Sequence, residues 1–179
     1  MGGVWPHQRA FMRKAMDPFH QGGKERARNL TMDSLATGAR NFSKRYEAWG
    51  GKLNSTDRTA RDHKGHDTHT PSIAGGNFVL GVSFSGVGNG TVKGGSPKAR
   101  VATYKVCWPP LSSGGGCYGA DIMESIDMAI HDGVDVISIS VGGDNGESYW
   151  EDSIAIGAFH AMKKGIVVVE TLDQPQEVS

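Results

Sequence analysis

The stretch from residue 100 to residue 169 alternates between two apolar patterns, and this alternation constrains the fold more than any other feature. Short runs rich in valine and isoleucine predict buried strands, and longer stretches with apolar residues at helical spacing predict amphipathic helices. In chain order, the expected elements are a strand at 100–106, a helix at 120–132, a strand at 134–141, a helix at 153–164 and a strand at 166–169. Strands joined by helices of this length predict a parallel sheet in an α/β domain.

The rest of the chain shows weaker patterns. Residues 1–60 carry scattered apolar side chains without a period, so we expect irregular structure there, apart from a short strand at 38–42. Residues 77–99 combine apolar anchors with many glycines and predict a hairpin and loops. The final ten residues are polar and continue no element. We therefore expect a partial domain over residues 1–169 and an unrelated polar tail over residues 170–179.

The charge balance limits the classes of partner. Lysine and arginine together number 19, as do aspartate and glutamate, so the formal net charge is zero and no basic stripe favours nucleic acid. The longest apolar runs are too short to cross a membrane. The first residues, Met-Gly-Gly-Val-Trp, lack the charged leader and apolar stretch of a signal peptide. These features predict a globular domain that binds neither nucleic acid nor a membrane.

The strongest chemical signal is the polar run at residues 61–70, which holds three histidines and two aspartates. Imidazole titrates near physiological pH and serves as acid, base or metal ligand. Three interpretations therefore compete: the general base of a nucleophilic enzyme, a metal site formed by Asp62, His63, His66 and His69, and a solvated loop. The metal site is the weakest because no glutamate follows as in His-Glu-X-X-His and no second cluster supplies ligands. We expect no metal and no cofactor.

The run Gly65-His66-Asp67-Thr68-His69 resembles the Gly-His-Gly-Thr-His motif of subtilisin-like serine proteases, also called subtilases or peptidase S8. Residues 93–102 and 104–109 are similar to the plant branch of that family. The resemblance runs from about residue 2 to residue 169. It implies a three-layer α/β fold with a parallel sheet, incomplete at both ends in this chain. It also implies serine endopeptidase activity with His66 as the general base.

The same resemblance assigns a substrate-binding segment. Ser140-Val141-Gly142 matches a Ser-Leu-Gly segment that pairs with the substrate backbone in this family. The resemblance therefore implies a peptide or protein substrate, held as an added strand through main-chain hydrogen bonds. Ligands of open parallel sheets bind at the carboxyl ends of strands, which agrees with this position. From the residues alone, Gly142-Gly143 is equally well a turn that ends a strand.

The chain departs from the family pattern in three places. Gly3-Val4-Trp5-Pro6 resembles the family motif Asp-Thr-Gly-Val-Trp-Pro, so Met1 stands where the catalytic aspartate belongs. Asp67 replaces the glycine that follows the base. Residues 170–174 replace the segment that carries the oxyanion-hole asparagine, and no serine of the sequence lies in a Gly-Thr-Ser-Met-Ala-like context.

These departures bear on activity because a general base alone has no nucleophile to activate. In subtilisin, the namesake of the family, removal of the serine lowers turnover by about 10⁶-fold. We therefore expect that the polypeptide as given, although of endopeptidase ancestry, is truncated and does not cleave peptides. The alternative is a non-catalytic remnant of the fold that binds peptides or another protein partner.

Two further features concern the compartment. The family resemblance implies an extracellular, secreted protein, and four Asn-X-Ser/Thr sequons mildly favour a secretory history. The sequons begin at Asn29, Asn41, Asn54 and Asn89. Cys107 and Cys117 lie across a loop rich in glycine, serine and proline, where a local disulfide or two buried thiols are both compatible with the sequence.

Overall fold

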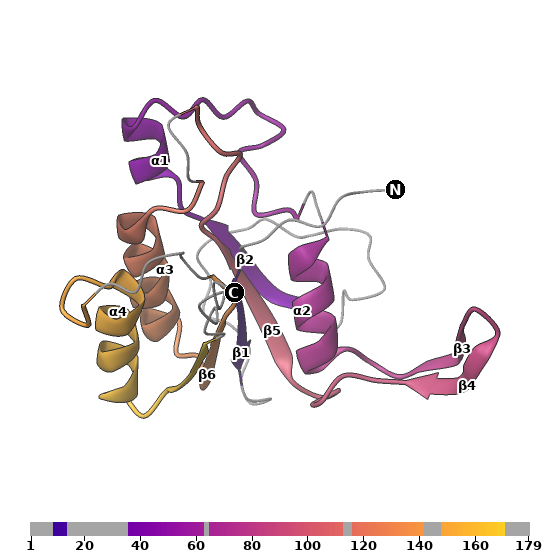
Figure 1. Cartoon of the computed structure of the whole chain (residues 1–179). Helices are drawn as coiled ribbons and strands as arrows, with labels where there is room; N and C mark the ends of the chain where they lie inside the picture. The colour runs from indigo at the N-terminus through magenta and orange to yellow at the C-terminus, as the bar shows by residue number, and fades with distance from the viewer. Residues whose placement is uncertain (1–8, 14–35, 63–64, 113–115, 142–147, 171–179) are drawn as a thin grey trace, which may run out of the picture.

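A five-stranded sheet forms the centre of the computed structural model, which describes residues 9–13, 36–62, 65–112, 116–141 and 148–170 (Figure 1). The strand order is β2-β5-β1-β6-β7. The strands are β1 Arg9–Arg13, β2 Ala36–Asn41, β5 Arg100–Lys105, β6 Val136–Ile139 and β7 Val167–Glu170. β2 pairs with β5 in parallel, and so does β6 with β7. β1 runs antiparallel to both β5 and β6, so the other four strands share one direction.

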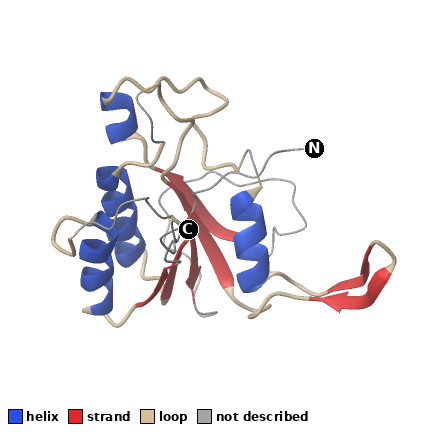
Figure 2. Cartoon of the chain, viewed as in Figure 1, coloured by secondary structure: helices blue, strands red, loops and turns tan. Residues whose placement is uncertain are grey.

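Helices cover both faces of this sheet and produce three layers (Figure 2). On one face, α2 (His66–Gly75) contacts β1 and β5. On the other face, α3 (Gly119–His131) and α4 (Ser153–Met162) pack against each other, with α3 against β5 and α4 against β7. The arrangement confirms the predicted α/β fold with parallel strands.

The region before residue 60 corrects the prediction of irregular structure. The expected strand at 38–42 is present as β2, but β1 and the short helix α1 (Lys44–Ala48) were not predicted. β1 lies between two strands whose backbone N–H and C=O groups need partners, and an antiparallel neighbour supplies them. Its sequence, Arg-Ala-Phe-Met-Arg, is short and begins and ends with a cation, so it lacks the apolar run expected of a central strand.

The bounds of the later elements agree with the sequence pattern to within a few residues, but the strand predicted to be buried at 166–169 is β7, an edge strand in which Val167 and Val169 are more than half exposed. The predicted hairpin between residues 77 and 99 consists of β3 (Val79–Phe84) and β4 (Val87–Val92), which form a separate two-stranded sheet. The core lies mainly between the large sheet and the α3–α4 layer. Its largest fully buried apolar side chains come from β5, β6, α3 and the residue after β5, and are Tyr104, Val106, Ile126, Ile137 and Ile139.

Two buried carboxylates tie elements together. Asp132, at the end of α3, accepts hydrogen bonds from Arg40 Nε (3.0 Å) and Nη2 (2.9 Å) and from the Tyr104 hydroxyl (2.6 Å). Asp121, in the first turn of α3, accepts the backbone N–H groups of Arg45 (2.9 Å) and Tyr46 (3.0 Å). The first group joins β2 and β5 to α3, and the second holds α1 over the start of α3.

Candidate active site

Helix α2 carries the histidine motif, and its direction fixes where that motif lies. At its C-terminal end, a methyl group on Gly75 would lie 3.0 Å from Cγ2 of Val101, close to the start of β5. At the other end, Lys105 Nζ donates to the carbonyl of Arg61 (3.2 Å), just before the helix. α2 therefore runs against β5, and its first residue, His66, lies at the carboxyl edge of the parallel strands.

The turn that leads into α2 is held by one carboxylate. Asp62 Oδ1 accepts the backbone N–H of Gly65 (2.8 Å), and Asp62 Oδ2 accepts both the N–H (2.9 Å) and the hydroxyl (2.8 Å) of Thr68. These bonds satisfy amide groups that the first turn of a helix leaves without partners. Because the bonds reach residues on both sides of position 66, they fix the backbone from which the His66 side chain projects.

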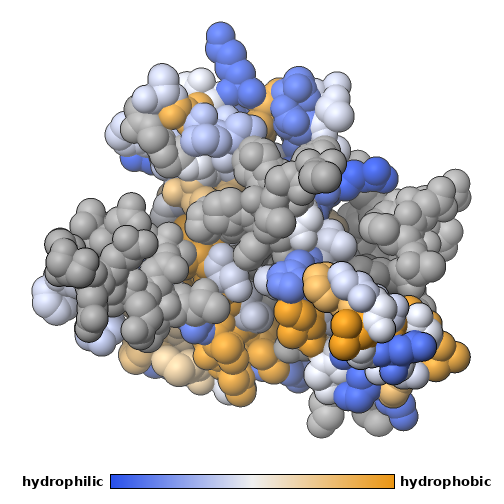
Figure 3. Space-filling model, turned by 45° about the vertical axis from the view of Figure 1, so that its right-hand side comes forward, coloured by the Kyte–Doolittle hydropathy of each residue, from blue (hydrophilic) through white to orange (hydrophobic). Residues whose placement is uncertain are grey.

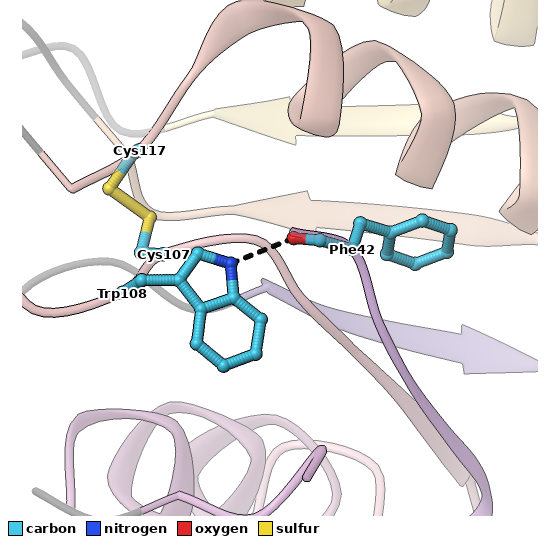
Figure 4. The surroundings of a disulfide bond; sticks show 4 residues. All are labelled: Phe42, Cys107, Trp108 and Cys117. Carbon is cyan, nitrogen blue, oxygen red and sulfur yellow. Dashed lines mark hydrogen bonds between the residues drawn. A yellow bond between two sulfur atoms is a disulfide. The ribbon is translucent and has the colours of Figure 1, made fainter. Parts of the chain in front are cut away.

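A disulfide-bonded loop follows β5 and is hydrogen-bonded to the residue after β2 (Figure 4). Cys107 and Cys117 form the disulfide, which confirms the bonded alternative for this pair. Trp108 is 2% exposed and donates its indole N–H to the carbonyl of Phe42 (2.8 Å), just after β2. The Lys105 ammonium lies 4.4 Å from the centre of the Trp108 ring. The loop after β5, at the same edge of the sheet as the start of α2, is therefore held by a disulfide and by the buried Trp108 side chain.

The predicted substrate segment begins at the same edge. Ser140 is half-buried and Val141 is 5% exposed, and both follow directly after β6. Gly142 lies outside the described residues. β6 shares its direction with β5, so Ser140 and Val141 occupy the same edge of the sheet as the start of α2. The structure thus brings the two predicted site segments to one edge.

The side chains of His66 and Asp67, and all of His63, lie outside what the structure describes. The role of His66 therefore remains a prediction, as does the absence of a metal from the polar run. In the described part of the chain, no three His, Cys, Asp or Glu side chains are grouped as metal ligands. His69 is exposed, and its backbone N–H donates to Gly65 in the helix (3.0 Å).

Three residues that stabilise this edge of the sheet were not predicted from the sequence: Asp62, which binds the turn before α2, Lys105 and Trp108. The sequence suggests a role for Asp62 only as a metal ligand. The N-cap of α2 is Gly65, which has no side chain, and Asp62 lies three residues earlier, so the usual N-cap signal does not identify it. Lys105 and Trp108 gave no signal either, because their contacts join segments far apart in the sequence.

The sheet and the helices on its two faces define a three-layer α/β domain, and comparison with known proteins specifies the family. The model of the Subtilase family, Peptidase S8, matches residues 8–170. The chain therefore belongs to the subtilase family.

Among curated relatives, the chain is 51% identical over 172 residues to "Subtilisin-like protease SBT5.3" of Arabidopsis thaliana. It is 50% identical over 169 residues to "Subtilisin-like protease SBT5.4" of the same plant. It is 47% identical over 179 residues to "Subtilisin-like protease Glyma18g48580" of Glycine max. These matches cover 93% of this chain and 22 to 23% of each relative, so the chain spans less than a quarter of their length. None of the helices within the described ranges is both long and apolar enough to cross a membrane.

Proposed function

We propose that residues 1–169 form part of the catalytic domain of a subtilisin-like serine endopeptidase. In this proposal His66 is the general base that takes the proton from a serine hydroxyl, and Ser140, Val141 and Gly142 bind the substrate backbone. The observation that carries the proposal is the direction of α2, which sets the backbone of His66 at the carboxyl edge beyond β5 and β6. Glu170 belongs to this domain as the last residue of β7, where it pairs with Ile139, and residues 171–179 are a tail outside it.

The proposal also covers what the 179-residue polypeptide does by itself. Nucleophilic catalysis requires a hydroxyl or thiol within hydrogen-bond reach of the base. The sequence has Met1 at the aspartate position and no serine in the family's serine context, and both cysteines are joined in a disulfide. We therefore infer that this polypeptide binds extended peptides at the strand edge without hydrolysing them.

Binding and hydrolysis are tested together by adding an extended peptide with a chromogenic leaving group. We expect no release of chromophore above the buffer rate, for the chain and for His66→Ala alike. We also expect the amide NMR signals of Ser140 and Val141 to shift on peptide addition, whereas the signal of Asn77, just after the C-terminal end of α2, does not. Release that is abolished in His66→Ala would contradict the inferred inactivity, and unchanged signals at both residues would contradict the substrate assignment.

A further inference from the structure

The β3–β4 hairpin stands away from the three-layer body of the domain (Figure 1). Its strands pair with each other and join no strand of the large sheet. Every residue of β4 is exposed, and so is every residue of β3 except one. The hairpin is therefore an arm with both faces open to solvent.

The arm is unusually apolar for an exposed segment. Phe84 is 86% exposed, Leu80 is 80% exposed and Val87 is 72% exposed. Figure 3 brings this side of the molecule forward, and hydrophobic residues are prominent on it. Residues 77–92 contain no charged side chain. Exposed strands that are apolar and uncharged are prone to pair with other chains and aggregate. A stable monomer would therefore need another group to shield the apolar side chains of this arm from contact with other molecules.

A glycan acceptor sequence lies on the same arm. Asn89-Gly90-Thr91 is an Asn-X-Thr sequon within β4, and its residues are exposed. The strand register pairs Val82 with Gly90 and Phe84 with Val87, which leaves one extra residue on β4 between those pairs. Asn89 lies in this irregular step, so a glycan attached to it would not interrupt a regular pair.

Of the other two sequons within the described residues, the one at Asn41 is less accessible and the one at Asn54 is exposed. In Asn41-Phe42-Ser43, Phe42 is 7% exposed, and the Ser43 hydroxyl donates to Glu47 Oε1 (2.7 Å). The side-chain oxygen of Asn54 accepts the backbone N–H groups of Thr56 (2.9 Å) and Asp57 (2.8 Å). The structure therefore favours Asn89 as the acceptor over Asn41, and Asn89 differs from the exposed sequon at Asn54 in lying on the apolar arm.

We propose that Asn89 is an N-glycosylation site and that its glycan shields the apolar arm from association with other chains. The donor is an oligosaccharide linked to a lipid through pyrophosphate. The side-chain nitrogen of Asn89 forms a bond to the anomeric carbon of the first sugar and loses a proton. The bond from that carbon to the pyrophosphate oxygen breaks, and the lipid pyrophosphate leaves. In a cell this reaction depends on entry into the secretory pathway, which the family resemblance implies.

The modification is tested on the folded chain with purified oligosaccharyltransferase and the lipid-linked donor. The glycans are then trimmed with an endoglycosidase that leaves one sugar on each site, and the sites are identified by peptide mass spectrometry. We expect modification at Asn89 and none at Asn41, and we expect Asn41 to react after unfolding in urea. Thr91→Ser keeps the sequon and should keep the glycan, whereas Thr91→Val should abolish it. An unmodified Asn89 in the folded chain, or equal reaction at Asn41, would overturn the assignment.

The shielding role needs a separate measurement, which is light scattering over time at matched concentration. We expect the glycosylated chain to aggregate several-fold more slowly than Asn89→Gln carried through the same reaction. Asn77→Gln changes an exposed asparagine outside any sequon and should behave like the unchanged glycosylated chain. Equal aggregation of the glycosylated chain and Asn89→Gln would refute the shielding role. Peptide hydrolysis is not a readout here, so the result is independent of the proposed catalytic function.

Discussion

Helices α3 and α4 approach closely where Gly157 of α4 faces Ile126 of α3, and this contact makes a quantitative prediction. A methyl group at Gly157 would lie 2.4 Å from Cδ1 of Ile126 and 3.2 Å from its Cβ and Cγ2. Nonbonded carbon atoms prefer separations of about 3.5–4.0 Å, so Gly157→Ala requires a movement of about 1 Å. Ile126 is 0% exposed, which leaves its side chain little room to move.

Two effects of opposite sign decide the outcome of Gly157→Ala. Replacing glycine with alanine in the interior of a helix stabilises it by about 1 kcal/mol. Adding a methyl group to a packed core costs about 1–3 kcal/mol. We therefore expect the free energy of unfolding to fall by up to about 2 kcal/mol, although the helix propensity improves.

The assay is urea unfolding of the whole chain followed by circular dichroism. Ile126→Val removes the obstructing Cδ1 atom and should by itself cost about 0.5–1.5 kcal/mol. In the Gly157→Ala background the same change should cost at least about 1 kcal/mol less, or become stabilising, because the two residues are in contact. A gain in stability for Gly157→Ala, with effects that simply add in the double variant, would refute the close approach of these helices.

Two further predictions concern the attachment of α1. Asp121→Ala leaves the N–H groups of Arg45 and Tyr46 without their acceptor and should lower the free energy of unfolding by about 2–3 kcal/mol. Asp127→Ala, at an exposed position of the same helix, should alter it by less than about 0.5 kcal/mol. Equal losses in urea titrations of the two variants would contradict this. The pKa of Glu47 is lowered, first by the hydrogen bond from the Ser43 hydroxyl and then by the hydrogen bond from Arg58. The stability that Glu47 contributes is thus present above its unfolded-state pKa and is lost as the pH falls through its folded-state pKa. NMR titration should find that pKa below 4.5, and removing the serine hydroxyl should raise it; no change would contradict the assigned cause.

The second half of the fold could be predicted because each element there carries its own signal. β6 and β7 are runs of β-branched residues, and α3 places Ile122 and Ile126 on one buried face. Local pattern and tertiary burial agree in β6 and α3. β7 is a strand as predicted, but it lies at the edge of the sheet and is mostly exposed, so the expected burial was wrong. β1 and α1 are each five residues long, and their formation depends on neighbours that come from distant parts of the chain.

Some parts of the candidate site could likewise be predicted from the sequence, and others could not. The histidine motif was recognisable because its residues are consecutive, and Ser140 and Val141 were recognisable as the end of a strand. The contacts that build the edge around them were not, since Lys105 reaches Arg61 across 44 residues and Trp108 reaches Phe42 across 66. Such contacts depend on the completed fold and leave no periodic trace in the sequence.

Reaction with a fluorophosphonate probe tests the central inference most directly, because the probe forms a covalent bond only with a serine activated by a neighbouring base. The polypeptide of residues 1–179 is incubated with the probe, and the labelled protein is detected by intact mass. We predict no labelling, for the chain and for His66→Ala alike. Stoichiometric labelling that disappears in His66→Ala would show that His66 activates a serine within this polypeptide, and would contradict the account.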